Sequence, residues 1–222
     1  WQNTADNMIT DAIRERSKTD VSFSASWRFG ATTLPGPITV EDIYNLIPSE
    51  APVNLMKIKG SDLKEVLEEA IDNVQAQDAF EQVGGDMLRY SGMEIVVDLK
   101  KTFPNRIQSI KIAGKPFEPN KMYTMSGLNA AVNNDERSVD RVITNKVGPL
   151  EVIAYIEEKK VIAPKLDNRI TDPSGRILAD NVDIQEYWTN TGRAAFDLNK
   201  DQIFRYAGSL QTNGKFTAER KQ

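Results

Sequence analysis

The hydrophobic period of the chain changes at Gly60, and this change limits the possible folds more than any other feature. Before it, Met56 and Ile58 alternate with lysines, which is the two-residue period of a strand with one solvated face. After it, apolar residues recur every three or four positions, as in an amphipathic helix, and Ser61 is a favourable N-cap. The apolar face of this helix comprises Leu63, Val66, Leu67, Ala70, Ile71 and Val74, and the opposite, solvated face is expected to carry Glu65, Glu68 and Glu69.

Both periods recur along the rest of the chain, in an irregular order. Helices are predicted over residues 5–17, from a capping-box-like start at Thr39, and from Gly148-Pro149; strands are predicted over 21–24, 54–59, 93–99 and 122–127, with a hairpin over 106–117. The polar segment 128–146 is predicted to be a long loop. Hairpins mixed with helices favour an α+β fold over a doubly wound parallel sheet.

The composition excludes several kinds of catalytic centre. The 222 residues include no cysteine and no histidine, so the chain alone cannot hold a disulfide, a thiolate zinc site, a Ser-His-Asp triad or a histidine-ligated pair of metal ions. We therefore expect no catalytic residue and no bound metal in this chain. A net charge of -4 argues against a dedicated nucleic-acid binder, and no apolar run approaches the ~20 residues of a membrane span.

The two ends of the chain differ in composition from its middle. The N-terminus begins with Trp1 and has no basic start or apolar stretch, so we expect no signal peptide and interpret the chain as a processed protein or a fragment. From Asp172 onward the pattern weakens while aromatic residues continue. We therefore expect a body over residues 1–170 and a C-terminal extension over 171–222 that packs its aromatics on the body.

Two arginines lie in similar settings, each in a glycine-containing segment next to aromatic residues. The planar guanidinium group suits phosphate, sulfate or carboxylate, and loops allow several such groups to converge on one ligand. The alternative is that each arginine pairs with a nearby carboxylate or stacks on its aromatic neighbour. The candidate substrate-binding residues are Trp27, Arg28 and Phe29 of the first segment, and Gly85, Asp86, Met87 and Arg89 of the second.

Several motifs between residues 4 and 170 occur in an order that resembles the C-terminal domain of the 5′-nucleotidase family. They are Asp6-Asn7-Met8-Ile9-Thr10-Asp11-Ala12, Ile58-Lys59-Gly60-Ser61-Asp62-Leu63-Lys64 and Ser91-Gly92-Met93. The resemblance implies mixed sheets flanked by helices and a role in substrate binding. It also implies a partner, an N-terminal metallophosphoesterase domain that carries two divalent metal ions, usually manganese. This chain alone should then be inactive, and the parent protein should be a periplasmic or extracellular hydrolase.

Within that family, the flanks of both arginines are most similar to the SoxB-like thiosulfohydrolase branch of bacterial sulfur oxidation. The similar segments are Trp27-Arg28-Phe29-Gly30, Leu34-Pro35-Gly36 and the run from Gln82 to Arg89. Nucleotidases carry Asn-Gly-Gly where this chain has Phe23-Ser24-Ala25, and they clamp the base between two phenylalanines. The first would fall at Met87, and residues 133–138 contain no aromatic for the second.

This resemblance implies a small sulfur oxyanion or phosphate ester as substrate, bound by Arg28 and Arg89. Two other interpretations stay open. One is a nucleotidase domain with a diverged base clamp, which would act on nucleotides. The other is a non-catalytic interaction module that uses the aromatics of the C-terminal extension as its docking surface.

Overall fold

The computed structural model describes residues 1–25, 36–76, 80 and 87–179. The chain divides into two compact units, Trp1–Asp180 and Asn181–Gln222, and the described residues belong to the first. The expected packing of the C-terminal extension on the body falls mainly on residues outside the described ranges. It therefore stays a prediction.

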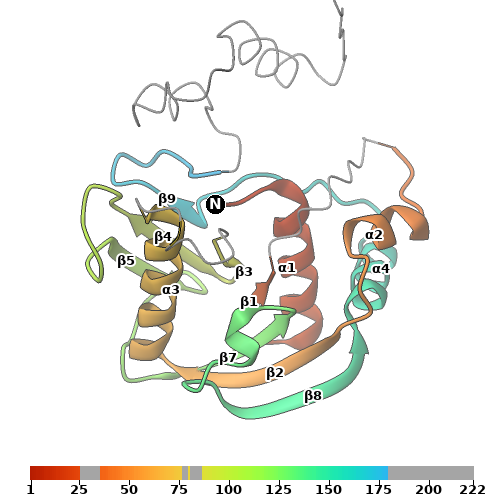
Figure 1. Cartoon of the computed structure of the whole chain (residues 1–222). Helices are drawn as coiled ribbons and strands as arrows, with labels where there is room; N and C mark the ends of the chain where they lie inside the picture. Colours follow the sequence, from red (N-terminus) through yellow and green to blue (C-terminus); the bar gives the residue numbers. More distant parts are fainter. Residues whose placement is uncertain (26–35, 77–79, 81–86, 180–222) are drawn as a thin grey trace, which may run out of the picture. The chain divides into compact units, whose positions relative to one another are not determined.

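Helices and strands alternate irregularly along the first unit (Figure 1). The elements in chain order are α1 (Thr4–Ser17), β1 (Val21–Ser24), α2 (Val40–Leu46), β2 (Pro52–Lys59), α3 (Gly60–Gln75), β3 (Arg89–Ser91), β4 (Met93–Val97), β5 (Ile107–Ile112), β6 (Lys115–Pro116), β7 (Met122–Leu128), a 3-10 turn η2 (Ala131–Asn133), β8 (Val139–Val147), α4 (Gly148–Lys159) and β9 (Ile170–Thr171).

The described strands form two mixed sheets, which confirms the α+β prediction. One has five strands in the order β3-β1-β7-β2-β8, and the other has four in the order β6-β5-β4-β9. The β1–β7 and β4–β9 pairs are parallel, and the other pairs are antiparallel. Gly92 joins β3 of the first sheet to β4 of the second with φ +90, and a Cβ there would lie 2.2 Å from the Asp20 carbonyl oxygen. Only glycine fits this junction without a shift.

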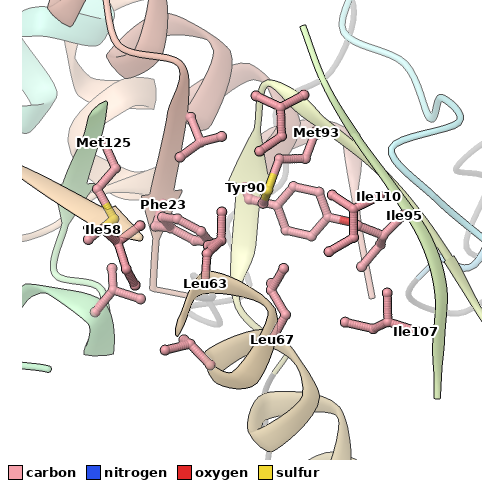
Figure 2. Close-up of a cluster of buried hydrophobic side chains, with 14 of the residues drawn as sticks. Phe23, Ile58, Leu63, Leu67, Tyr90, Met93, Ile95, Ile107, Ile110 and Met125 are labelled. Carbon is pink, nitrogen blue, oxygen red and sulfur yellow. The ribbon is translucent and has the colours of Figure 1, made fainter. Parts of the chain in front are cut away.

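Helix α3 packs between the two sheets, where it buries the apolar stripe that the sequence predicts. Figure 2 shows Leu63 and Leu67 with Phe23 and Ile58 on one side and residues of β4 and β5 on the other. A second cluster lies under α1, where Ile9 and Ile13 pack with residues of α2, α4 and the start of β2. Each fully buried Leu or Ile contributes roughly 1.5–3 kcal/mol relative to an exposed one, so these clusters hold the layers together.

The predicted loop over residues 128–146 is wrong, because β8 spans Val139–Val147 there. Most of its side chains are exposed, so no apolar alternation marks it in the sequence. Its pairing with β2 also shifts register twice, and Asp140 has a φ of 52. Such bulges break the two-residue period. The backbone ladder to β2 holds this strand in place without help from an apolar face.

The predicted N-cap at Ser61 is also wrong, because the N-cap is Lys59, two residues earlier. Helix α3 begins at Gly60, its N-cap Lys59 makes no side-chain cap bond, and the Ser61 hydroxyl donates to Asp62 instead. The backbone N–H groups of Gly60 and Ser61 donate to the carbonyls of Lys121 and Pro119, each at 2.8 Å. Carbonyl groups of a distant segment therefore accept the first backbone N–H groups of the helix. The sequence around Ser61 does not indicate these hydrogen bonds.

The predicted solvated face of α3 holds for Glu65 and Glu69 but not for Glu68. The Glu68 side chain is buried, with 1% exposure, and its carboxylate accepts the backbone N–H groups of Ile107 (2.7 Å) and Arg106 (3.1 Å). It therefore anchors the start of β5 on α3. In contrast, the predicted capping box at Thr39 is confirmed, with Asp42 as its second member.

Candidate ligand-binding edge

Three connections of the chain leave from one edge of the five-stranded sheet. Ser24, the last residue of β1, pairs with Leu128 at the end of the parallel strand β7 and with Arg89 at the start of the antiparallel strand β3. The backbone N–H of Ala25 donates to the Leu128 carbonyl at 3.1 Å and extends this pairing by one residue. The described ends of these three strands, Ser24, Arg89 and Leu128, therefore lie together at one edge of the sheet.

Most of the expected site residues belong to two of these connections. Trp27, Arg28 and Phe29 follow β1, and Gly85 and Asp86 precede β3. These five lie outside the described residues, and their assignment stays a prediction. Met87 and Arg89 are described, so their surroundings bear on what this edge can do.

Arg89 lies in a buried ion pair with the first turn of α1. Its side chain is 6% exposed, and its Nε lies 3.0 Å from Oδ2 of Asp6, which is 1% exposed. Asn3, the N-cap of α1, donates from Nδ2 to the same Asp6 oxygen at 2.8 Å and accepts the Asp6 backbone N–H. The sequence allowed either a ligand contact or a carboxylate pair for this arginine, and the structure places a carboxylate at its Nε.

Met87 lies inside the molecule, with 3% exposure in the cluster around α3. Tyr90 is buried in the same cluster, with its ring centroid 6.4 Å from that of Phe23. Neither side chain forms a surface on which a ligand could stack. Burial raises the pKa of Tyr90 well above its ordinary value, since the charged form would lose its hydration.

A second buried arginine, Arg169, contacts both β3 and α1, and no local pattern in the sequence indicates these contacts. Its Nη1 donates to the Tyr90 carbonyl (2.8 Å), its Nη2 lies 3.2 Å from Asp11 Oδ2, and its Nε donates to Asp167 (2.8 Å). Burial alone would lower the pKa of Arg169, but its hydrogen bond to Asp167 and the charge of Asp11 raise it. The Tyr90 hydroxyl donates back to the Arg169 carbonyl at 2.7 Å. This network fixes β3 against α1.

The described part of the chain contains no group of three or more Asp or Glu side chains that could hold a metal ion. Next to the end of β7, Asn129 Nδ2 donates to Ser49 Oγ at 3.0 Å. Among the described helices, none is both long and apolar enough to cross a bilayer.

The chain is similar in sequence to two curated proteins. Rat 5′-nucleotidase is 24% identical over 149 residues, which cover 61% of this chain and 25% of that protein. Endonuclease YhcR of Bacillus subtilis is 33% identical over 187 residues, which cover 81% of this chain and 14% of that protein. The chain thus spans only about a quarter, or less, of the length of these relatives.

Solved structures share the fold. The Thermus thermophilus sulfate thiohydrolase SoxB matches with a TM-score of 0.67 and 24% identity, over 78% of this chain and 32% of that one. The 5′-nucleotidase precursor of the same organism matches with a TM-score of 0.62 and 22% identity, over 76% and 35%. The family model described as the 5′-nucleotidase C-terminal domain matches residues 2–136. The chain therefore belongs to the family of 5′-nucleotidase C-terminal domains.

Proposed function

We propose that this chain is the substrate-binding domain of a two-domain, metal-dependent hydrolase. Its partner would be an N-terminal metallophosphoesterase domain, and its ligand a small anion bound by Arg28 and Arg89. The observation that carries the proposal is the register at Ser24, which places the end of β1, four residues before Arg28 in the sequence, beside Arg89. Family membership supports it, because this chain matches only 35% and 32% of the length of the two solved structures, which therefore contain further residues outside the matched domain.

The side chains of this chain suit it for binding the anion and leave metal binding to the other domain. With no histidine or cysteine in the sequence, the residues present do not fit a pair of hydrolytic metal ions. Two divalent ions, manganese by resemblance, would belong to the other domain and activate the attacking water there. Arginines of this domain would bind the anionic group and stabilise the charge that develops on it.

A small sulfur oxyanion or phosphate ester is the substrate class that we favour over a nucleotide. Met87 stands where the resemblance places the first base-stacking phenylalanine of nucleotidases, and its side chain is buried in the core. A nucleotide would need an aromatic platform, whereas a small oxyanion needs only charge and hydrogen-bond donors. A periplasmic or extracellular location, implied by the resemblance, is part of the same proposal.

Nucleotides are the second candidate, because several curated relatives carry the name 5′-nucleotidase. The test uses the protein with its metallophosphoesterase domain and compares sulfate release from a protein-bound thiosulfonate, in which water attacks the sulfonate sulfur and leaves a persulfide, with hydrolysis of adenosine monophosphate. We expect activity on the sulfur compound and a loss of about 100-fold in Arg28→Ala. Arg176→Ala, an exposed arginine paired with Asp172, is the matched control. Activity on the nucleotide alone would favour the second candidate. Unchanged rates in Arg28→Ala and Arg89→Ala would contradict the assigned roles.

A further inference from the structure

The ion pair between Arg89 and Asp6 is buried on both sides. Exposure is 6% and 1%, and Nε lies 3.0 Å from Oδ2. Removing two charges from water costs several kcal/mol per ion, and their attraction offsets this only when the geometry is good. An apolar pair of similar volume would often stabilise a fold as well. Stability alone is therefore a weak reason for this pair, and the orientation that it imposes is the more specific consequence.

Asp6 is a rigid point of attachment for the arginine. It lies in the first turn of α1, where the helix dipole favours a carboxylate. Its Oδ2 accepts Asn3 Nδ2 at 2.8 Å, and its backbone N–H donates to Asn3 Oδ1 at 2.8 Å. The aspartate side chain is thus held from the N-cap side while it contacts Arg89 on the other.

Nε of Arg89 is one of the atoms in this contact, and a contact at Nε restrains the orientation of the guanidinium group. The group is planar, so a bond at Nε fixes the plane and with it the direction of the two Nη atoms. Arg89 begins β3 opposite Ser24, at the edge where the proposed anion would bind. A fixed guanidinium at this place loses less side-chain entropy on binding than a mobile one.

We propose that Asp6 is a positioning residue for Arg89 in the binding of a small oxyanion. It would act through the arginine without touching the ligand. This inference rests on the proposed function, because it assumes that Arg89 contacts the anion. It adds a residue of α1 to a site otherwise built from the sheet edge.

The chain offers a matched control on the same helix. Asp11 also bridges α1 to β3, since it accepts the Ser91 hydroxyl and lies 3.2 Å from Arg169, so its side-chain contacts in the described part of the chain go to residues other than Arg89. Asp6→Asn and Asp11→Asn each remove one charge from the α1–β3 contact. A purely structural role for Asp6 predicts that both variants lose stability and that neither affects anion binding selectively.

The 222-residue chain is titrated with sodium thiosulfate and with sodium phosphate, and binding is followed by NMR at the Arg89 Hε–Nε signal, assigned with Arg89→Lys. We expect Asp6→Asn to weaken binding about tenfold, Asp6→Ala to weaken it further because no acceptor remains, and Asp11→Asn to stay within about twofold. Unfolding in urea is measured for every variant. If Arg28→Ala abolishes binding, the proposed function stands. Equal losses of affinity in Asp6→Asn and Asp11→Asn, or no loss in either, would then overturn the inference about Asp6 alone. No binding by the unmodified chain, or unchanged binding in Arg28→Ala, refutes the proposed function and the inference with it.

Discussion

The arginines of this domain lie in two environments, buried and exposed, and their ion pairs contribute differently to the free energy of unfolding. Arg89 and Arg169 are buried and contact α1, where each partner carboxylate is also held by other groups. Arg176 is 48% exposed, and its pair with Asp172 lies at the surface. Exposed pairs contribute between roughly zero and 1 kcal/mol, because water screens them. The buried arginines should therefore respond far more strongly to substitution.

Arg169 provides the first test of this difference. Arg169→Met keeps the aliphatic stem but leaves the Tyr90 carbonyl and the carboxylates of Asp11 and Asp167 without their shared donor. We expect a loss of about 3 kcal/mol in the free energy of unfolding, measured by urea denaturation. Arg176→Met, the matched surface variant, should change it by less than about 1 kcal/mol. Similar losses in the two variants would contradict a structural role for the Arg169 network.

At the level of elements, the sequence predicts those whose apolar side chains face one buried surface. The α1 and α3 helices and the β4 strand were predicted from their periods, since their buried positions recur with the spacing of the element. β8 was missed because it is an edge strand held by backbone pairing with β2, without an apolar period in its sequence. The start of α3 was misplaced because its donors bond to Lys121 and Pro119, some sixty residues away.

The candidate site shows the same limit. The sequence identified arginines in similar settings, and strand pairing at Ser24 places Arg89 beside the end of β1, the strand that precedes Arg28 in the sequence. It could not show that Arg89 pairs with Asp6, because that contact joins residues 83 positions apart. Nothing near Asp167 or Arg169 in the sequence indicates contacts with α1 and Tyr90. Tertiary pairing of charges is set by how the layers pack, and local patterns do not encode it.

Helix caps give a prediction on which the sequence and the structure disagree. Ser61 fits the N-cap pattern but caps nothing, whereas Thr39 accepts the Asp42 backbone N–H in a full capping box. We expect Thr39→Ala to lower the free energy of unfolding by about 1 kcal/mol and Ser61→Ala to change it by less than about 0.5 kcal/mol. Chemical denaturation of both variants distinguishes them. A loss at Ser61 as large as that at Thr39 would restore the sequence-based cap.

The whole domain depends on segments that are distant along the chain. Helix α3 packs on both sheets, Gly92 passes the chain from one sheet to the other, and β9 pairs with β4 across more than seventy residues. The body also continues past residue 171. The Leu178 backbone N–H donates to the Ile170 carbonyl at 3.0 Å, and Leu178 and Ala179 are buried. The residues just after β9 therefore belong to the core of the body.

This position of the boundary can be measured by shortening the chain. A protein ending at Ala179 keeps Leu178 in the core, and one ending at Thr171 loses it, so we expect the shorter protein to unfold at lower urea, by about 2 kcal/mol or more. Leu178→Ala in the protein ending at Ala179 should reproduce a loss of about 2 kcal/mol in the free energy of unfolding, while Leu150→Ala, on a half-exposed residue of α4, should have little effect.

Equal stability of the two shortened proteins would place the end of the body before Asp172. A higher stability of the full chain than of the protein ending at Ala179 would support the predicted packing of the extension, because all of its aromatic residues lie beyond that point.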